Sequence, residues 1–387
     1  TDIIMNLTSK DISEDFPNSG KIYLNNASVS LMPSQSIEAM KDFLISYNSI
    51  GPDSINSEPF VTEKLQNIRK IIAKIINCQP EEVILTQSTT DGINIVANGL
   101  SFEQNSNLII RGFSHEHHAN FYPWLRLQNK TKIRNLSIDK NGFFDFNELK
   151  TLLDSNTKLV AISHALYNTG SILPVEKIGN MLENHTTFFI DSAQTVGCIG
   201  NFDVAKIKCD FMSFNGSKWL CGPMGTGLFY CNKKSQELLE PMTIGGESAM
   251  IYDNTNLVFK DIPDKFQTGF RNYVGMVGLE SSANYLLKFG MENIRKKNLY
   301  LSNLLREELS KIKNIILYGS EIPQERTSIV SFNIDGHDPQ AIVEKLEKQN
   351  IVLAVREILE KKIVRASPHF FNTESEILHV IDVIKNL

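Results

Sequence analysis

Short apolar runs alternate with helix-length amphipathic segments along the first two thirds of the chain. The apolar runs predict strands at 81–87, 107–113, 158–165, 186–193, 210–216 and 225–231. Two intervening segments, 146–155 and 175–185, have the spacing of amphipathic helices. Parallel strands that are buried on both faces are apolar throughout, so the pattern predicts an α/β fold with an open, mostly parallel sheet covered by helices on both faces.

The pattern changes near residue 281, where a smaller C-terminal α+β domain is expected. It predicts one long helix over 281–312, a strand over 327–334, a helix that opens at Asp338 and Pro339, and a final strand and helix. The join is expected near 260–266. The predicted division is an N-terminal segment 1–20, a large domain 21–262 and a small domain 263–387.

The amino-acid composition limits the kinds of binding partner that are expected. The chain has 387 residues, of which 42% are hydrophobic, so it can bury a large core. Its 39 basic residues against 44 acidic ones give a net charge of −5, which predicts neither a nucleic-acid nor a membrane partner. Acidic residues occur near the start, where a signal peptide needs a basic segment, and no long apolar window follows. We expect a cytoplasmic protein.

The cysteines do not indicate a disulfide framework or a zinc site. Their number is odd, and no CxxC pair or Cys/His cluster has metal spacing. The five are Cys78, Cys198, Cys209, Cys221 and Cys231. Free thiols in a reducing compartment are the expected state.

Polar residues that follow the predicted strands are the first places to look for a site, because ligands of open α/β sheets bind at the carboxyl ends of strands. The stretch QSTTDGIN (87–94) suits a phosphate at a helix N-terminus, although an ordinary cap by Ser88 or Thr89 explains it as well. The stretch SHEHHANFYPW (114–124) places three histidines at a strand end. Metal binding by them lacks a supporting cysteine or acid.

Two charged residues stand out against apolar surroundings. Asp191 ends a fully apolar strand, where a carboxylate needs a cationic or hydrogen-bonding partner. Lys218 follows 27 residues later in SFNGSKWLCGPMGTGLFY (213–230). It is either a surface residue or a buried amine whose lowered pKa makes it a nucleophile.

The motifs TTDGIN, EHHANFYPW, DSAQTVG and FNGSKWLCGPMGTG, in this order, resemble the class V aminotransferase family of pyridoxal-phosphate enzymes. That family contains cysteine desulfurases, cysteine and cystine C–S lyases, selenocysteine lyases and isopenicillin N epimerase-like proteins. The resemblance extends from IYLNNAS (22–28) to VRASPHFFNTESEI (364–377). It implies a large domain that binds pyridoxal 5'-phosphate, a smaller C-terminal domain, an amino-acid substrate and a homodimer.

The resemblance implies roles around the cofactor ring. Lys218 would form the Schiff base and move the proton at Cα, and Asp191 would pair with the pyridinium nitrogen. His117 would stack on the ring, so that a metal role for the histidines becomes unnecessary. Gln194 and Asn168 would donate hydrogen bonds to the ring oxygen.

It also implies residues for the phosphate and the substrate. Thr89 and Thr90 would hold the phosphate. Asn215 and Ser217 stand where most relatives have Ser and His, and they can still donate to it. Arg365 would bind the substrate carboxylate as a bidentate fork.

One departure concerns the partner subunit. The family's Gly-Thr-Pro segment reads TGFRN (268–272) here, and Phe270 offers no hydroxyl to a neighbouring phosphate. Arg271 either supplies that contact by charge or is a surface arginine. The segment 245–272 is expected to complete the site of the second copy.

The departure that bears most on the reaction lies in AVREILEKKIVR (354–365), which holds no cysteine where desulfurases carry a nucleophilic thiol. Cys221, near Lys218 in sequence, is expected to be buried and structural. We therefore favour a C–S lyase that eliminates sulfur from cysteine or a cysteine derivative without a protein persulfide. Epimerisation and transamination begin with the same deprotonation and remain alternatives, and a non-catalytic relative is a remote one.

Overall fold

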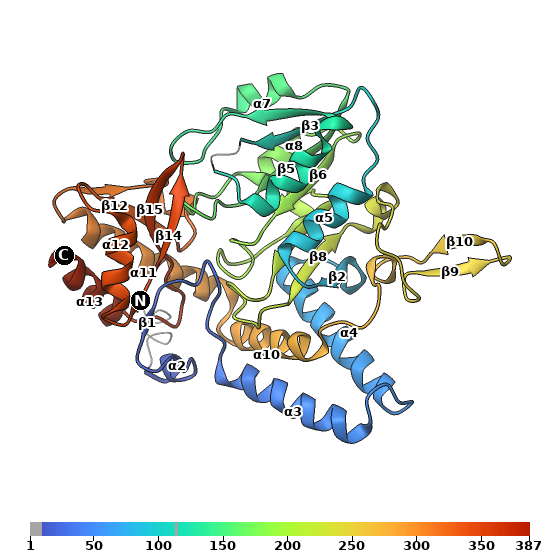
Figure 1. Cartoon of the computed structure of the whole chain (residues 1–387), viewed down its shortest axis with the longest axis horizontal. Helices are drawn as coiled ribbons and strands as arrows, with labels where there is room; N and C mark the ends of the chain where they lie inside the picture. Colours follow the sequence, from blue (N-terminus) through green and yellow to red (C-terminus); the bar gives the residue numbers. More distant parts are fainter. Residues whose placement is uncertain (1–9, 113–114) are drawn as a thin grey trace.

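The computed structural model describes residues 10–112 and 115–387, so the last residue of the predicted strand 107–113 and the first residue of the histidine stretch 114–124 lie outside the described residues. A large body forms one end of the molecule and a smaller body of strands and helices lies beside it (Figure 1). A thin two-stranded arm projects from the far side of the large body.

A seven-stranded sheet forms the centre of the large body. Its order is β2-β8-β7-β6-β5-β3-β4, and β8 alone runs antiparallel to its neighbours. The strands are β2 (Val83–Thr86), β3 (Asn107–Arg111), β4 (Lys132–Leu136), β5 (Thr157–Ser163), β6 (Thr187–Asp191), β7 (Phe211–Asn215) and β8 (Gly227–Cys231). The predicted α/β fold with a mostly parallel sheet is confirmed.

Successive strand residues contribute to two apolar cores, one on each face of the sheet. In β6, Phe188 and Ile190 belong to one core and Phe189 to the other. The first core includes α4 (Ser57–Ile76), α8 (Val175–Met181), α9 (Val204–Ile207) and α10 (Tyr273–Phe289), and the second includes α5 (Thr89–Gly99) and α6 (Tyr122–Leu125). No helix in the described part of the chain is both long and apolar enough to cross a membrane.

The smaller body has a sheet of its own. Its four strands are antiparallel in the order β11-β12-β15-β14, and β1 (Ile22–Tyr23) pairs separately with β13 (Ile351–Val352). The elements are α11 (Met291–Ser310), β11 (Ile315–Leu317), β12 (Val330–Ile334), α12 (Pro339–Glu347), β14 (Ala354–Ile358), β15 (Lys361–Ala366) and α13 (Glu374–Lys385). As predicted, Asp338 caps α12 by accepting a hydrogen bond from the Ala341 amide at 3.2 Å.

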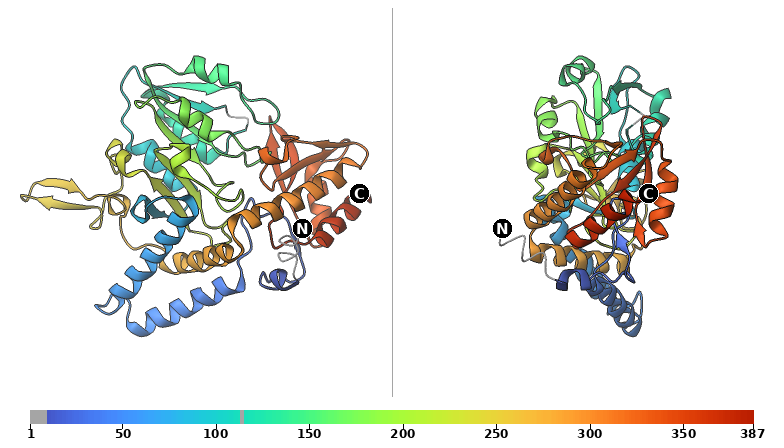
Figure 2. Two further views of the ribbon diagram at one scale, coloured as in Figure 1. Left: turned by 180° about the vertical axis from the view of Figure 1, so that it is seen from behind. Right: turned by 90° about the vertical axis from the view of Figure 1, so that its left-hand side faces the viewer.

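The expected single helix over 281–312 is two helices. Gly290, with φ of +82°, separates α10 from α11, since this left-handed conformation ends a helix at little cost only for glycine. The two helices run in succession from the large body to the small one (Figure 2). Helix α10 packs on α3 (Ser34–Ile50) and α4 of the large body. The division at 262/263 stays a prediction, and the packing of α10 favours a boundary nearer Gly290.

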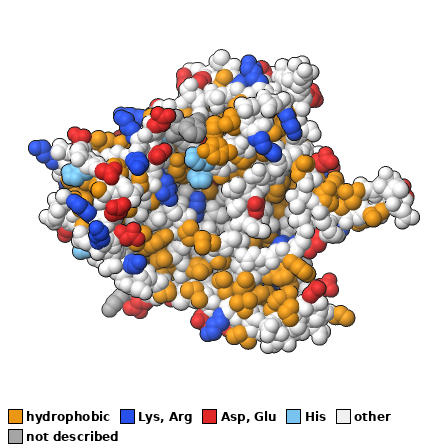
Figure 3. All heavy atoms as spheres, viewed as in Figure 1, with side chains coloured by type: hydrophobic (Ala, Val, Ile, Leu, Met, Phe, Trp, Pro, Cys, Tyr) orange, Lys and Arg blue, Asp and Glu red, His pale blue; other side chains and the backbone are white. Residues whose placement is uncertain are grey.

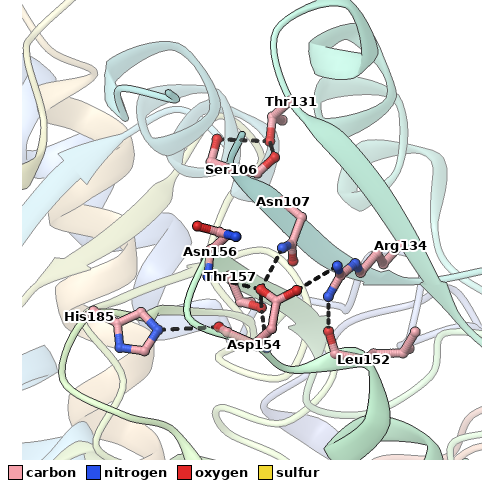
Figure 4. Close-up of polar contacts among 9 residues, drawn as sticks. All are labelled: Ser106, Asn107, Thr131, Arg134, Leu152, Asp154, Asn156, Thr157 and His185. Carbon is pink, nitrogen blue, oxygen red and sulfur yellow. Dashed lines mark hydrogen bonds and ion pairs between the residues drawn. The ribbon is translucent and has the colours of Figure 1, made fainter. Parts of the chain in front are cut away.

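A polar network joins the amino ends of β3 and β5 to β4 (Figure 4). Asp154, just before β5, accepts hydrogen bonds from the Asn107 amide at 2.9 Å and from Arg134 at 2.6 Å. The pKa of its carboxyl falls to about 2, chiefly because of the Asn107 hydrogen bond. This edge is thus fixed by side chains that bond to one another, while polar groups at the opposite edge remain available.

Helix α7 (Phe146–Leu152) lies between β4 and β5 in sequence, and a short helix α2 (Lys10–Glu14) precedes β1. The projecting arm is the antiparallel hairpin of β9 (Ala249–Tyr252) and β10 (Asn256–Phe259). The outer strand residues of this arm are exposed and apolar. The arm therefore lacks a core of its own within one chain.

Candidate active site

A cavity of about 210 Å³ lies at the carboxyl edge of the central sheet. The ends of β5, β6 and β7 and the start of α5 form its walls. It brings together eight of the predicted site residues: Thr89, Thr90, His117, Asp191, Gln194, Asn215, Ser217 and Lys218. Residues far apart in the chain therefore converge where the topology of an open α/β sheet predicts a ligand site.

The start of α5 forms one end of the cavity. Ser88 is the helix cap, and its hydroxyl accepts a hydrogen bond from the Asp91 amide at 3.2 Å. Thr89 and Thr90, in the first turn, line the cavity instead. Gly227 allows the strand to approach, since a Cβ there would lie 2.2 Å from the Ser88 nitrogen. The amide groups of this turn and the positive end of the helix suit an anion.

The end of β7 contributes further donors beside this turn. The Asn215 side-chain amide donates to the Thr89 hydroxyl at 2.9 Å, and the Ser217 hydroxyl donates to the side-chain oxygen of Asn215 at 3.3 Å. Each of these three side chains also lines the cavity. They form a hydroxyl and amide cluster that could bind phosphate oxygens.

Lys218 and Asp191 face the same cavity from neighbouring strand ends. Burial lowers the pKa of the Lys218 amine to about 8, although the nearby Asp191 charge opposes this change. Burial raises the pKa of Asp191, while a hydrogen bond from the Ala193 amide at 2.9 Å and the charge of Lys218 act in the other direction. The cavity thus holds a partly neutral amine and a carboxylate that benefits from a cationic partner.

Gln194 and Asn168 differ in their position. Gln194 lines the cavity, and its amide bonds to the Ala27 carbonyl at 3.0 Å and to the Trp219 indole at 2.9 Å. Asn168 does not line it, because its buried amide donates to the Glu357 carbonyl of β14 at 2.9 Å. Tyr167, which no sequence argument singled out, lies in the wall instead.

The three histidines do not converge. The His117 ring lines the cavity, while His118 stacks on Tyr122 with ring centroids 4.7 Å apart, and His115 is buried against Asn168. Burial, followed by the charge of Lys218, lowers the pKa of His117 to about 4, so its imidazole is neutral at pH 7. Among the described residues no trio of histidine, cysteine or acidic side chains could hold a metal ion.

Two arginines lie side by side on the hairpin of β14 and β15. Arg365 pairs across the strands with Ala354, so Arg356, two residues further along, lies on the same face of the sheet. Both guanidinium groups donate to the Ser28 hydroxyl, Arg365 at 2.6 Å. Burial and the neighbouring Arg356 keep the pKa of Arg365 well below its usual range. No acid forms an ion pair with either arginine in the described structure, which suits an anionic ligand.

The sequence alone does not single out Arg356 as a site residue. The signal was two arginines on the strands of a short hairpin, and only the strand register shows that they share a face. Their charges both lower the pKa of Lys218 and of His117, so the two arginines lie near these groups, although neither arginine lines the cavity itself.

Arg271 lies apart from this cavity. It forms an ion pair with Glu247 at 2.6 Å and lines a neighbouring concavity of about 420 Å³. Gln87 borders both spaces, so the concavity adjoins the α5 end of the cavity. A role for Arg271 toward a second copy remains a prediction.

Glu116 is a buried carboxyl group directly behind the cavity wall. It accepts hydrogen bonds from the His117 amide at 3.0 Å, from the Ser163 amide at 3.3 Å and from the Ser163 hydroxyl. Burial raises its pKa to about 7, and the charge of Arg111 only partly opposes this change. In the sequence Glu116 stands out only as the neighbour of His117. Its burial results from packing against the end of β5, which the sequence does not reveal.

The pKa of Glu116 predicts a pH dependence of stability. The folded state binds a proton here between pH 4.5 and about 7 that the unfolded state releases, so this group lowers stability as the pH rises through that window. Glu116→Gln removes the titration. The unfolding free energy of the variant, relative to wild type, should rise by an amount on the order of 3 kcal/mol between pH 4.5 and 7.5.

Denaturant unfolding of the cofactor-free protein at a series of pH values measures this difference. Glu63→Gln, at an exposed position of α4, is the matched control and should give a flat difference. A Glu116→Gln difference that is also flat would refute the raised pKa.

Comparison with known proteins agrees with this geometry. The model of the family described as Aminotransferase class-V matches residues 22–380. A probable cysteine desulfurase of Methanothermobacter thermautotrophicus is 31% identical, with 96% of each chain covered. The cysteine desulfurase of Wigglesworthia glossinidia brevipalpis is 33% identical over 90% of this chain and 88% of its own. The apo structure of cysteine desulfurase from Thermococcus onnurineus superposes with a TM-score of 0.90 at 27% identity, covering 98% of each chain.

The match spans nearly the whole sequence, and it includes the cavity and both bodies of the fold. The chain therefore belongs to the class-V aminotransferase family of pyridoxal-phosphate enzymes, as the order of its motifs predicted.

Proposed function

We propose that the protein is a cytoplasmic pyridoxal-phosphate enzyme that cleaves the C–S bond of cysteine or a cysteine derivative and releases the sulfur without a protein thiol. The observation that carries this proposal is the pairing of the Lys218 cavity with a short β14–β15 hairpin that holds no cysteine. The cysteine desulfurase relatives support C–S chemistry.

The residues present fit the cofactor. Thr89, Thr90 and Asn215 offer the hydroxyl, amide and helix N-terminal groups that a phosphate requires. Asp191 has one oxygen bonded to the Ala193 amide, and the raised pKa of its buried carboxyl supports a role in which a protonated ring nitrogen would stabilise the carboxylate. When bound, pyridoxal phosphate supplies an electron sink that makes the Cα proton of an amino acid acidic.

The other side of the cavity suits the substrate. Arg365 and Arg356 offer guanidinium donors to the α-carboxylate, and their existing partners are neutral carbonyl and hydroxyl oxygens. With an amino acid bound, the Lys218 amine would be the group that takes the proton from Cα. Its lowered pKa keeps a substantial fraction neutral near pH 8.

The hairpin carries no thiol and leaves little room for one. Ile358 pairs with Lys361, so only Leu359 and Glu360 form the turn, both with positive φ. A mobile sulfur-transfer loop needs more residues than this turn has.

The cysteines elsewhere are poor nucleophiles. Burial raises the pKa of Cys221 to about 12 and that of Cys198 to about 11, and it raises the pKa of the other three as well. Cys221 is fully buried beside the Ser30 hydroxyl. These thiols do not form the reactive thiolate that a persulfide relay requires.

The second part of the proposal is a homodimer. Exposed hydrophobic side chains gather over α3 and beside the base of the arm on the face seen in Figure 3. Apolar surface of this extent, together with a β9–β10 arm whose apolar side chains are exposed in a single chain, indicates a large interface with another protein. The exposed residues are Ile37, Leu44, Ile45, Met224, Met242, Ile244, Met250, Ile251, Tyr252, Leu257, Val258 and Phe270. A second copy would cover them and bring Arg271 and the 245–272 segment close to the opposite cavity.

Cofactor capture should follow the titration of Lys218. The neutral amine is the nucleophile, so the capture rate should rise about tenfold per pH unit below pH 8 and level off above it. Stopped-flow absorbance of the cofactor-free protein mixed with pyridoxal phosphate measures the rate, and Lys218→Ala should show no covalent capture.

Lys297→Arg is the control, because it changes a second buried lysine in the small body. It should capture the cofactor as the wild type does. If the wild-type capture rate instead had its pH midpoint near the pKa of a solvent-exposed lysine, the desolvated environment assigned to Lys218 would be contradicted.

The sulfur should leave the enzyme free in solution. Incubation with cysteine or an S-substituted cysteine should yield pyruvate, ammonia and sulfide, or pyruvate, ammonia and a small thiol or persulfide. Because the thiols are buried and protonated, Cys221→Ser should retain activity within about threefold. Colorimetric sulfide and pyruvate assays measure both products.

The same assays distinguish the other reactions open to this site. Inverted substrate without pyruvate would indicate epimerisation, and a new amino acid from an added keto acid would indicate transamination. A stoichiometric persulfide on one of the five cysteines, with loss of activity on its replacement, would establish a protein thiol relay.

The dimer should have twice the 43.7 kDa mass of one chain. Phe270 is 78% exposed and Ile251 is 72% exposed. The double variant Phe270→Asp, Ile251→Asp should weaken dimer association by about tenfold or more, because it places charges in an apolar contact. Multi-angle light scattering across a dilution series gives the mass. Ile322→Asp, on the small body, is the matched control. Full activity at the mass of one chain would exclude a shared site.

A further inference from the structure

Tyr167 occupies the cavity wall where β5 gives way to the following loop. Its ring is half-buried and meets the His117 ring edge-on, with centroids 5.1 Å apart and planes at 88°. Its carbonyl oxygen accepts a hydrogen bond from Arg365 at 2.7 Å. The residue is therefore fixed between the group expected over the cofactor ring and the group expected at the substrate carboxylate.

The hydroxyl of Tyr167 forms no hydrogen bond within the described part of the chain, and its ring borders the cavity. Three other tyrosine hydroxyls donate hydrogen bonds: Tyr23 to the Val29 carbonyl at 2.6 Å, Tyr285 to Asp15 at 2.6 Å and Tyr300 to Glu374 at 2.7 Å. A fourth, that of Tyr318, accepts one from the Asn333 side-chain amide at 3.3 Å. A phenol at a cavity wall whose oxygen is uncommitted can bind a ligand atom.

Cleavage of a C–S bond requires a proton donor near the departing sulfur. The bonding electrons leave with sulfur, and a thiolate of an alkyl thiol is a poor leaving group unless it receives a proton. Lys218 is occupied at Cα, and the imidazole of His117 is neutral at pH 7, so its remaining N–H is a much weaker acid than a phenol. The β14–β15 turn supplies no thiol.

We propose that the Tyr167 hydroxyl donates the proton that the departing sulfur needs, an inference that rests on the C–S lyase function proposed above. Burial raises the pKa of this phenol, which keeps it protonated at neutral pH, while the charges of Arg356 and Arg365 stabilise the phenolate left after transfer. Serine and threonine hydroxyls along the wall are much weaker acids than a phenol.

The step balances without an oxidant or reductant. Lys218 takes the Cα proton, and the electron pair of the Cα–H bond forms the Cα=Cβ double bond. The Cβ–S bond breaks, and its electron pair leaves with sulfur. The Tyr167 O–H bond breaks and an S–H bond forms. The phenolate then regains a proton from water, and the Lys218 ammonium loses its proton before the next turnover.

Leaving groups of different basicity test this role. Tyr167→Phe should lower kcat about 100-fold or more for S-ethylcysteine, whose thiolate needs a proton, because general acid catalysis contributes effects of that size. With β-chloroalanine the leaving chloride needs no proton, so the loss should stay below about threefold. Equal losses for the two substrates, or no loss for S-ethylcysteine, would overturn the proposal.

Two measurements separate a catalytic role from a structural one. Exchange of the Cα proton of alanine in D₂O, followed by NMR, should be unchanged in Tyr167→Phe, because Lys218 performs that step. Ultraviolet titration of the cofactor-free protein, wild type minus variant, should place the Tyr167 pKa above the ordinary value of a tyrosine. A phenolate at neutral pH would contradict a donor role.

Tyr23→Phe is the matched control, since Tyr23 also lies near Arg365 but its hydroxyl is bonded to Val29. Any effect of that change should be the same for both leaving groups. If the wild type expels chloride but never a thiol, the C–S lyase function and the Tyr167 role both fall. If the wild type cleaves S-ethylcysteine and the Phe variant does so equally well, the role of Tyr167 alone is wrong.

Discussion

The structure depends on burying charged groups together at the carboxyl edge of one sheet. Burial raises the pKa of Asp191 at the end of an apolar strand and lowers the pKa of Lys218 in the same cavity, while the opposite charge of each group partly opposes the shift of the other. The parallel strands place both groups at the carboxyl ends of neighbouring strands. A protonated ring nitrogen near Asp191 and a carbonyl carbon near Lys218 would relieve both costs, which explains how one cofactor can satisfy the cavity.

The two sides of the cavity differ in charge and in the way they are built. Helix α5 presents backbone amides and hydroxyl groups, which suit a phosphate, while the smaller body supplies Arg356 and Arg365 from adjacent strands. Because α11 and the small sheet follow the Gly290 break, the arginines approach from a separate body. The short β14–β15 turn joins the strands that carry these arginines and contains no cysteine. The proton for the sulfur must therefore come from a residue of the cavity wall.

Much of this arrangement could be predicted from the sequence, since buried parallel strands are apolar along their whole length and the polar residues after them mark the site. Asp191 and Lys218 were found in this way. The break at Gly290 was missed because amphipathic spacing continues on both sides of it. The resemblance implied Asn168 and nothing pointed to Tyr167, because an irregular loop has no period that fixes which of two neighbours faces the cavity. Arg356 and Glu116 required the strand register and the burial that only the fold supplies.

The most direct test of the account is the site at which the cofactor becomes attached. The wild-type protein is loaded with pyridoxal phosphate, reduced with borohydride and digested, and the modified peptide is identified by mass spectrometry. The account predicts one modification per chain, on the peptide that contains Lys218. Stoichiometric modification of another lysine, or cofactor that dissociates unreduced, would contradict the assignment of this cavity as the active site.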